Sequence, residues 1–427
     1  MPLEDIRGQT LSAIEVFSLS IRALKEHLAR TIESRGGVVL DNRKTNWVLT
    51  VPAIWTDTAK HFMRTSAEMA DIPSDKLSIV LEPEAASVYC QTFPPPGCRD
   101  IVNKGTKYII VDIGGGTTDI TVHEKLTDGS LKELTRATGD ECGGTSIDNQ
   151  YIQLIVRIFG GPFYNEFKKQ YPDSYLSLIR GFESTKRTIQ TRIESEYQNF
   201  TIPYAALNKL CQSELSDDLE KVVTKFAQSD KVKLFLDKLQ IKSDYAKSFF
   251  KATTNNIVSV LRTVLLDKDA SGVNYMLLVG GFANCGLVQD ALKRSFPELT
   301  IIVPEEAGTA VLKGAVLLGY KTDFISSRVI RYTYRVSVAR PFDRDKHDRR
   351  RRFKKDGEVY YKDEIKYTDD GTCTLLGTVE VQIPNPTKHL RNVDVIFHFG
   401  GTELTVTAVD EETKRNCPVS FVIQDFR

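Results

Sequence analysis

Three consecutive glycines interrupt two strand-like runs just after the first quarter of the chain. The stretch YIIVDIGGGTTDITV, residues 108–122, places Gly114, Gly115 and Gly116 between apolar runs rich in β-branched residues. Such flanks predict that the glycines form the turn of a β-hairpin. Because glycine lacks a Cβ, the backbone can come close to a ligand, and consecutive N–H groups can point at one anion. The stretch therefore predicts either a phosphate loop or a glycine-rich turn without a ligand.

The spacing of the glycines excludes the two commonest phosphate motifs. A Walker loop requires G-x-x-x-x-G-K and then Ser or Thr, and no such run occurs. A dinucleotide fingerprint requires a helix after the glycines, whereas DITV predicts a strand. Thr117 adds a hydroxyl beside the turn, and Asp112 and Asp119 add carboxylates of the kind that Mg²⁺ prefers. The motif is thus a hairpin loop with a carboxylate on each side.

The overall charge gives no indication of a polyanionic partner. The 427 residues carry 57 basic and 56 acidic side chains, so we expect neither nucleic acid nor a membrane surface as a partner. No apolar run is long enough to span a bilayer, and the first residues lack the pattern of a signal peptide. The 7 cysteines include no C-x-x-C pair, which predicts free thiols and favours a cytoplasmic location.

Strand and helix patterns alternate in the first part of the chain. Ser12 and Glu15 resemble a capping box at the start of a helical pattern. Two strand–helix pairs follow, at 46–72 and 77–91. This alternation is typical of an α/β architecture. The Pro- and Gly-rich segment 93–105 then predicts a surface connection between two lobes.

The rest of the chain predicts a second α/β lobe and then a β-rich region. After the hairpin, residues 147–266 predict a long helical region. Residues 275–296 predict a strand, a glycine turn and a helix, and 307–320 predict a small-residue helix that can pack closely. Near Phe324 the pattern changes to a period of two, which predicts antiparallel strands. The predicted domains are 1–105 and 106–325, the two lobes, and 326–427, the β-rich domain.

Several stretches together resemble one protein family. The hairpin resembles the second phosphate loop of the actin, sugar-kinase and 70-kilodalton heat-shock ATPase superfamily. The stretches that resemble the 70-kilodalton heat-shock protein family, in its order, are LTVPAIWTDTAKHFMRTSAEMADI, LEPEAASVY, GDECGGTSIDN, FESTKRTIQ, LLVGGFANCGLVQDAL and PEEAGTAVLKGAVLLG. The details are most similar to the divergent 12A/12B branch of that family. The resemblance implies an actin-like, ribonuclease-H-like, two-lobed ATPase fold followed by a small all-β domain similar to a substrate-binding domain.

The resemblance implies ATP or ADP with Mg²⁺ as cofactors and gives each matched residue a role. Asp112 would lie near Mg²⁺ and the attacking water as a catalytic and metal-binding residue, and Glu82 would lie beside them. The residues matched to nucleotide contacts are Gly114, Gly115, Gly116 and Thr117 at the phosphates, Gly143 and Gly144 beside the nucleotide, Glu183 at the ribose, Lys186 and Arg187 at the nucleoside, and Gly280 and Gly281 at the adenosine turn.

Several of these residues have an alternative explanation. Glu82 also fits a carboxylate placed at a helix start by the helix dipole. Asp119 fits a turn residue that binds backbone, which is the common fate of Asp at a turn. Gly143 and Gly144 fit a helix-entry turn.

The predicted nucleoside contacts have alternatives too. Glu183, Lys186 and Arg187 have i, i+3 and i+4 spacing, which also predicts a solvated ion-pair cluster on one helix. Typical family members follow the adenosine turn with a serine and then a basic residue, whereas this chain has Phe282 and Asn284.

The first phosphate loop of the superfamily is not found. It has the form D-x-G-T-T, and no such run precedes Tyr108. The catalytic lysine of the family lies upstream of the TVPA match, in a region this chain lacks. Gly308 stands where the family carries an acidic residue in its second connecting segment. We therefore expect an N-terminally incomplete fold with weak or no ATP turnover.

Three functions remain open from the sequence. The first is a chaperone-like protein, in which ATP would regulate a C-terminal domain that binds a polypeptide client or a signalling partner. The second is a non-catalytic interaction protein that kept the fold and lost turnover. A sugar or metabolite kinase is the third, and the β-rich tail argues against it. The basic run at 344–357 fits a solvated hairpin loop or a contact for an acidic lipid, nucleic acid or phosphoprotein.

Overall fold

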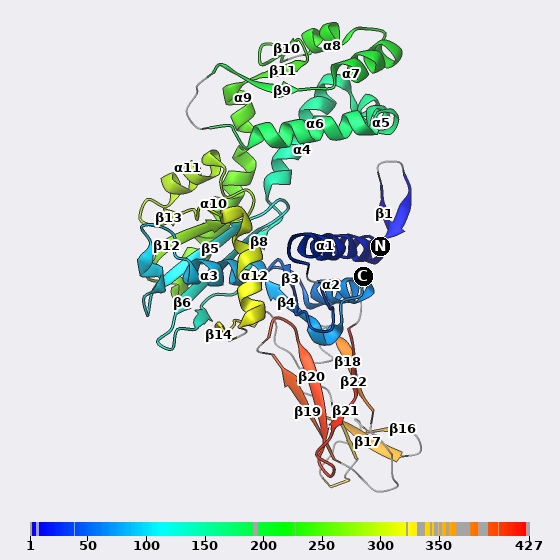
Figure 1. The fold of residues 1–427 in the computed structure, drawn as a ribbon, viewed down its shortest axis with the longest axis vertical. Coiled ribbons are helices and arrows are strands. Elements are labelled where there is room, and N and C mark those ends of the chain that lie inside the picture. Colours follow the sequence, from blue (N-terminus) through cyan, green and yellow to red (C-terminus); the bar gives the residue numbers. More distant parts are fainter. Residues whose placement is uncertain are drawn as a thin grey trace. The chain divides into compact units, whose positions relative to one another are not determined.

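A computed structural model gives the fold of the chain (Figure 1). The residues that it describes are 2–5, 8–37, 39–190, 195–226, 228–321, 323–330, 338–341, 344–345, 349, 352–355, 358–363, 376–382, 392–399 and 401–423. The chain divides into two compact units, Met1–Val329 and Ile330–Arg427.

The first unit begins with a hairpin, a parallel strand pair and two helices. The elements are β1 (Pro2–Glu4), β2 (Thr10–Ser12), α1 (Ala13–Gly36), β3 (Trp47–Val51), α2 (Asp57–Met69) and β4 (Leu77–Leu81). β3 runs parallel to β4, and α1 packs on α2. The predicted capping box is confirmed, because Ser12 Oγ accepts the Glu15 N–H at 3.4 Å and the Glu15 carboxylate accepts the Ser12 N–H at 3.1 Å.

A mixed sheet forms the centre of this unit. Its strands are β5 (Lys107–Ile113), β6 (Thr118–Lys125), β7 (Leu131–Glu133), β8 (Thr138–Asp140), β12 (Val273–Val279), β13 (Thr300–Ile302) and β14 (Ile325–Ser327). The order is β13-β12-β5-β6-β7-β14, with β8 also pairing with β6. β12 is parallel to β5 and β13, whereas β5 and β6 are antiparallel. The predicted glycine hairpin is thus confirmed.

The central strand β5 is buried on both faces, since successive side chains of a strand point to opposite sides. Ile109, Val111 and Ile113 belong to one core, which includes residues of several helices. Tyr108 and Ile110 belong to a second core on the other face. The first core includes residues of α4 (Gly144–Phe159), α10 (Lys251–Leu265) and α11 (Gly286–Ser295), among other helices, and the second includes residues of α3 (Glu82–Thr92) and α12 (Ala310–Tyr320).

The small-residue helix predicted at 307–320 does pack closely. Figure 1 shows α3 and α12, far apart in the sequence, side by side. A Cβ built on Gly314 would fall onto the carbonyl group of Ala85. Glycine is therefore required at this crossing, because only the missing side chain lets the two backbones approach.

The predicted long helical region is wrong in one respect, since it contains a three-stranded sheet. The strands are β9 (Tyr197–Thr201), β10 (Val232–Phe235) and β11 (Lys238–Lys242). They pair antiparallel in the order β10-β11-β9. The helices around them are α5 (Gly161–Gln170), α6 (Pro172–Lys186), α7 (Tyr204–Leu210), α8 (Leu219–Lys225) and α9 (Ser243–Ser248). Each strand is short and polar on one side, so its apolar residues are few.

The described elements of the second unit are all strands. They are β15 (Val338–Pro341), β16 (Arg352–Lys355), β17 (Glu358–Asp363), β18 (Gly377–Val381), β19 (Val393–His398), β20 (Thr405–Asp410), β21 (Asn416–Cys417) and β22 (Val419–Ile423). β15-β17-β16, β18-β22 and β19-β20-β21 form antiparallel groups. Most of the alternating stretch at 330–338 and part of the basic run at 344–357 lie outside the described residues.

Two further sequence expectations concern thiols and membrane spans. The six cysteines that the structure describes are unpaired, as predicted. In the described ranges, no helix combines the length and the apolar character that crossing a membrane requires.

Candidate functional site

The glycine loop between β5 and β6 is open on its outer side. The Gly114 N–H donates to the carbonyl of Thr117 at 2.9 Å and closes the turn. No atom lies within 4 Å of a Cβ built on Gly115 or Gly116, and both residues are exposed. The loop therefore has free space beside a backbone that can approach a ligand closely.

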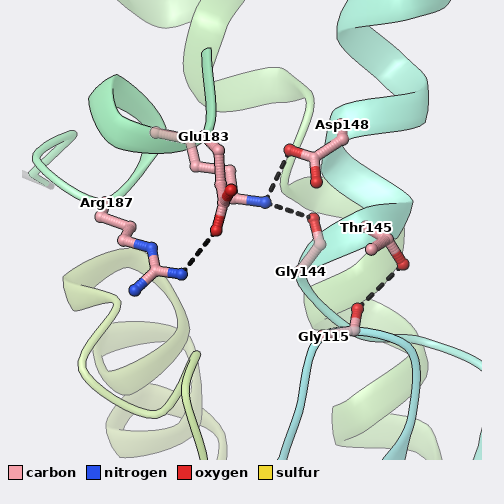
Figure 2. A network of polar contacts seen from close by, with 7 residues as sticks. Gly115, Gly144, Thr145, Asp148, Glu183 and Arg187 are labelled. Carbon is pink, nitrogen blue, oxygen red and sulfur yellow. Dashed lines mark hydrogen bonds and ion pairs between the residues drawn. The ribbon is translucent and has the colours of Figure 1, made fainter. Parts of the chain in front are cut away.

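The inner side of the loop is held by the start of α4. The Gly144 N–H donates to Gly114 O at 3.1 Å, and the Thr145 N–H donates to Gly115 O at 2.8 Å. Figure 2 shows a second bond to Gly115 O, from Thr145 Oγ1 at 2.9 Å. A Cβ on Gly143 would lie 2.7 Å from Gly114 O. Gly143 is thus needed for close packing of helix and loop, which agrees with the helix-entry explanation.

Two aspartates and one glutamate surround the base of the loop. Asp112 and Asp119 are paired across β5 and β6 and are 5% and 1% exposed. Glu82 is the half-buried first residue of α3. Burial, followed by repulsion from Asp112 and Asp119, raises the pKa of Glu82 to about 8. Burial and then repulsion from Asp119 raise the pKa of Asp112 to about 7. A cation at this position would relieve the repulsion and favour the ionised forms.

Asp119 has partners of its own. Its Oδ1 accepts the N–H of Ile54, just beyond β3, at 3.0 Å. Burial raises the pKa of Asp119, while hydrogen bonds from Ile54, Thr117 and Ala53 oppose the rise. Asp119 therefore binds backbone. Its backbone partners lie just after β3, and its side-chain partner lies within the loop.

The donor set fits Mg²⁺ only in a hydrated or phosphate-bound form. In the parts of the chain that the structure describes, no three His, Cys, Asp or Glu side chains converge closely enough to hold a metal ion. Mg²⁺ is usually held by one or two carboxylates, with water and phosphate oxygens completing the shell. Asp112 would supply a carboxylate to the ion, and Glu82 lies near enough to Asp112 to interact with it electrostatically.

The glycine turn after β12 packs against the end of β5. Gly280 has φ 92°, and a Cβ on it would lie 2.6 Å from Ile113 O and closer still to Asp112 Oδ1. The Phe282 N–H donates to Ile113 O at 2.9 Å. Gly281, in contrast, has no atom within 4 Å of a built Cβ. Gly280 is therefore required by packing, whereas Gly281 borders open space.

The three charged residues predicted at the nucleoside, which lie at the end of α6, have different environments. Lys186 is 3% exposed and donates to Gly144 O at 2.9 Å and to Asp148 Oδ1 at 2.6 Å. Arg187 and Glu183 form an exposed ion pair of 2.7 Å, which Figure 2 shows beside Asp148. Lys186 thus ties α6 to α4, and only Glu183 and Arg187 match the solvated-pair alternative.

A buried ion pair near the unit boundary was not predicted. Glu84, 1% exposed, accepts from Arg328 Nε at 2.6 Å and from Arg328 Nη2 at 3.0 Å. Glu133 accepts the Val329 N–H at 2.8 Å. Burial raises the pKa of Glu133 to about 7. The only sequence signal was a second glutamate two residues after Glu82, which does not identify a partner so far along the chain.

Comparisons with known proteins agree with this architecture. The model of the family described as "Hsp70 protein" matches residues 4–353. Heat shock 70 kDa protein 12A of Homo sapiens is 29% identical over 96% of this chain and 68% of its own length. Heat shock 70 kDa protein 12B of Homo sapiens is 28% identical over 84% and 60%. Chaperone protein DnaK of Mycoplasmoides gallisepticum is 26% identical over 65% and 42%. The resemblance read from the motifs is confirmed, and the chain belongs to the Hsp70 protein family.

Proposed function

We propose that this chain is a heat-shock-type protein that binds an adenine nucleotide, and that the nucleotide regulates a C-terminal binding domain. The observation that carries the proposal is the free space at Gly115 and Gly116 beside a group of mutually repelling carboxylates. Backbone N–H groups of a glycine loop favour phosphate oxygens, and carboxylates favour the Mg²⁺ that accompanies them. The Hsp70 family has an actin-like ATPase fold, with which the mixed sheet and its helices agree.

The residues of the site divide into three groups in this proposal, and Lys186 has a separate role. Gly114 to Thr117 contact the phosphates, and Asp112 and Glu82 lie at the metal and the attacking water. Gly144, Gly281, Glu183 and Arg187 border the nucleoside. Lys186 is tied to Asp148 and orients α4 and α6 rather than stacking on the base. Mg²⁺, when bound, would neutralise phosphate charge, while this chain's backbone orients the phosphate group.

The C-terminal part would bind the partner. We assign 1–105 and 106–325 to the two lobes and 326–427 to a β-rich domain that receives a polypeptide client or a signalling partner, in the cytoplasm. The support is the array of strands in the second unit, together with relatives named as chaperones. A strand-adding site is the mode that such a domain favours.

We expect weak or no hydrolysis by this chain. The sequence holds no D-x-G-T-T run before Tyr108 and has Gly308 where the family carries an acidic residue. In the described residues, β3 and β4 pair only with each other, so they bring no second glycine hairpin to the site. Phosphoryl transfer depends on positioning and charge neutralisation from both sides of the phosphate. Rapid ATP hydrolysis by the purified chain would contradict this part of the proposal.

The second candidate is a non-catalytic interaction protein. Two observations favour it: the ammonium of Lys186 is committed to Asp148, and the buried Phe282 follows the adenosine turn. Such a protein would give no heat with ATP under any condition.

Isothermal titration with ATP and Mg²⁺ tests the proposal, using the full chain and two leucine variants. Gly115→Leu fills the free space, so we expect at least a tenfold loss of affinity, about 1.4 kcal/mol. Gly161→Leu is the matched control, because Gly161 also has no atom within 4 Å of a built Cβ and starts α5 elsewhere. Equal affinities for ATP in both variants would exclude the loop as the phosphate site.

A further inference from the structure

The sheet of β9, β10 and β11 has one buried face and one solvent face. Val232, Leu239, Ile241 and Phe200 are at most 1% exposed and belong to the core of the lobe. Since side chains alternate along a strand, the residues between them point outward. The register aligns these outward residues in rows, which are Lys233, Gln240 and Asn199; Phe235, Lys238 and Thr201; and Lys242 with Tyr197.

The outward face is basic and carries no carboxylate. Lys233, Lys238 and Lys242 lie on it, and Lys231 joins it at the edge, where its carbonyl accepts the Lys242 N–H at 2.8 Å. In the described part of the chain, none of these four ammonium groups has a carboxylate within ion-pair distance. Asp230 and Asp237 lie in the turns next to these strands.

Two lysines of a neighbouring helix are neutralised. Lys221 pairs with Asp218 at 3.2 Å, and Lys225 pairs with Asp217 at 2.5 Å. Both belong to α8, so this helix differs from the sheet, where the lysines gather on one face without carboxylate partners. Because like charges gathered without partners repel each other, the sheet face favours an anionic ligand.

Aromatic and amide groups stand between the lysines. Lys233 Nζ lies 3.8 Å from the centre of the Tyr197 ring, so this ring helps to hold the ammonium in place. Gln240 Nε2 donates to Asn199 Oδ1 at 2.8 Å, which leaves the remaining amide edges on the face. Phe235 is 56% exposed and sits across from Lys238. An exposed ring next to an ammonium can stack a base while its phosphate is neutralised.

The turn at the end of this sheet is not built for stability. Leu236 has φ 55° and is 74% exposed, at a position where glycine would be favoured. A bulky residue in the left-handed region that buries nothing in the core suggests selection for contact instead. Leu236 extends the apolar surface of Phe235 beyond the lysines.

We propose that the outward face of the β9–β11 sheet binds single-stranded nucleic acid. The net charge of +1 averages over the whole chain and does not describe this local surface. Lysines supply phosphate contacts, the Gln240–Asn199 pair supplies polar groups for base edges, and Phe235 supplies a stacking surface. A flat sheet suits unpaired bases, which stack on exposed rings, whereas a duplex keeps its bases stacked internally. The proposal does not depend on nucleotide binding at the glycine loop.

Fluorescence anisotropy of the full chain with a labelled oligouridine tests the proposal. The double variant Lys233→Ala/Lys238→Ala removes two phosphate contacts, so the slope of log affinity against log salt should fall in magnitude by about 1.4. The control Lys221→Ala/Lys225→Ala makes the same charge change on α8 and should leave the slope unchanged. Phe235→Ala should lower affinity by about fivefold or more without changing the slope, because stacking contributes roughly 1–3 kcal/mol per base.

Other results would overturn the proposal. Equal loss in both double variants would indicate a general charge effect, and failure of the oligouridine to bind would exclude the surface as a nucleic-acid site. Binding of a labelled duplex as tightly as the single strand would contradict the stacking role of Phe235. Binding only to vesicles of phosphatidylcholine and phosphatidylserine, with none to the oligonucleotide, would assign the face to a membrane surface instead. The substituted lysines and Phe235 are exposed, so the fold should persist in all variants.

Discussion

The sharpest structural prediction concerns the two neighbouring glycines of the turn after β12. Gly280 has φ 92°, and a Cβ on it would lie 2.6 Å from Ile113 O and closer to Asp112 Oδ1. Gly281 has no atom within 4 Å of a built Cβ and no positive φ. The two positions therefore differ in strain although they are adjacent in the chain.

The expected magnitude follows from two separate costs. An alanine held at positive φ is disfavoured by about 1–2 kcal/mol. Forcing a methyl group against a backbone carbonyl and a buried carboxylate adds roughly 1–3 kcal/mol of overpacking. Gly280→Ala should thus lower the free energy of unfolding by about 2–5 kcal/mol. Gly281→Ala should change it by less than about 0.5 kcal/mol, as a surface substitution does.

Urea unfolding of the full chain measures this difference, with the intrinsic fluorescence and the far-ultraviolet circular dichroism recorded together. Both signals are needed because a chain with two units need not unfold in one step. The quantity compared is the shift of the first-unit transition in each variant. Equal midpoints for Gly280→Ala and Gly281→Ala would refute the packing argument, and so would destabilisation by Gly281→Ala alone.

Three further predictions concern buried charges. The pKa of Asp112 is raised from 3.8 to about 7 in the folded protein, so the folded state holds this proton more tightly than the unfolded state. The resulting stabilisation is fully present below pH 3.8 and is lost as the pH rises through 7. This pH-dependent loss amounts to at most about 4 kcal/mol, and Asp112→Asn should remove it. Urea midpoints of the variant and the unchanged chain, compared across the pH range, measure the difference. Arg328→Met should cost about 3–5 kcal/mol because it leaves Glu84 buried without its cation, and adding Glu84→Gln should restore part of that in the same assay. Lys186→Met should destabilise the lobe by about 1–3 kcal/mol, because the hydrogen bond to Gly144 O is lost. Amide hydrogen exchange at the start of α4 should then become faster. Unchanged exchange there would contradict the role of Lys186 in holding α4 and α6 together.

Local patterns were enough to predict the hairpin, the capping box and the close-packed helix. Gly114 to Gly116 lie between β-branched runs, and Ser12 and Glu15 satisfy each other's backbone within one turn. In the hairpin and the capping box the interacting atoms are near in the sequence, whereas for the close-packed helix only its small residues were a local signal and its partner α3 is far away in the chain. Patterns of that kind are determined by short-range geometry, and the structure preserves them.

The β9–β11 sheet could not be predicted by the same means. β9 pairs with β11 across about forty intervening residues, as Tyr197 opposite Lys242 illustrates. Each strand offers only two or three apolar side chains between lysines and amides. Such a sequence is equally compatible with a polar helix face, so the pairing partner and not the local pattern decides the structure.

The environments of the α6 charges show a related limit within the site. Lys186 and Arg187 are adjacent, yet one is buried against Asp148 and the other is exposed with Glu183. Neighbouring positions on a helix differ by about 100°, so one can face the core while the next faces solvent. The placement of α4 beside α6 determines which of Lys186 and Arg187 is buried away from solvent.

Helix α3 offers a physical route by which the proposed nucleotide site and the C-terminal unit would be coupled. Glu82 begins the helix and is repelled by Asp112, whereas Glu84, in the same first turn, holds Arg328 next to the unit boundary at Val329. A cation that relieves the repulsion on Glu82 changes the forces on this turn. Because the close contact between Gly314 and Ala85 fixes the start of α3 against α12, the first turn has little freedom to move without changing the Glu84–Arg328 pair. Regulation of the C-terminal domain, if it follows the proposal above, therefore requires this ion pair, and loss of nucleotide-dependent change in Arg328→Met beside retained ATP binding would be its signature.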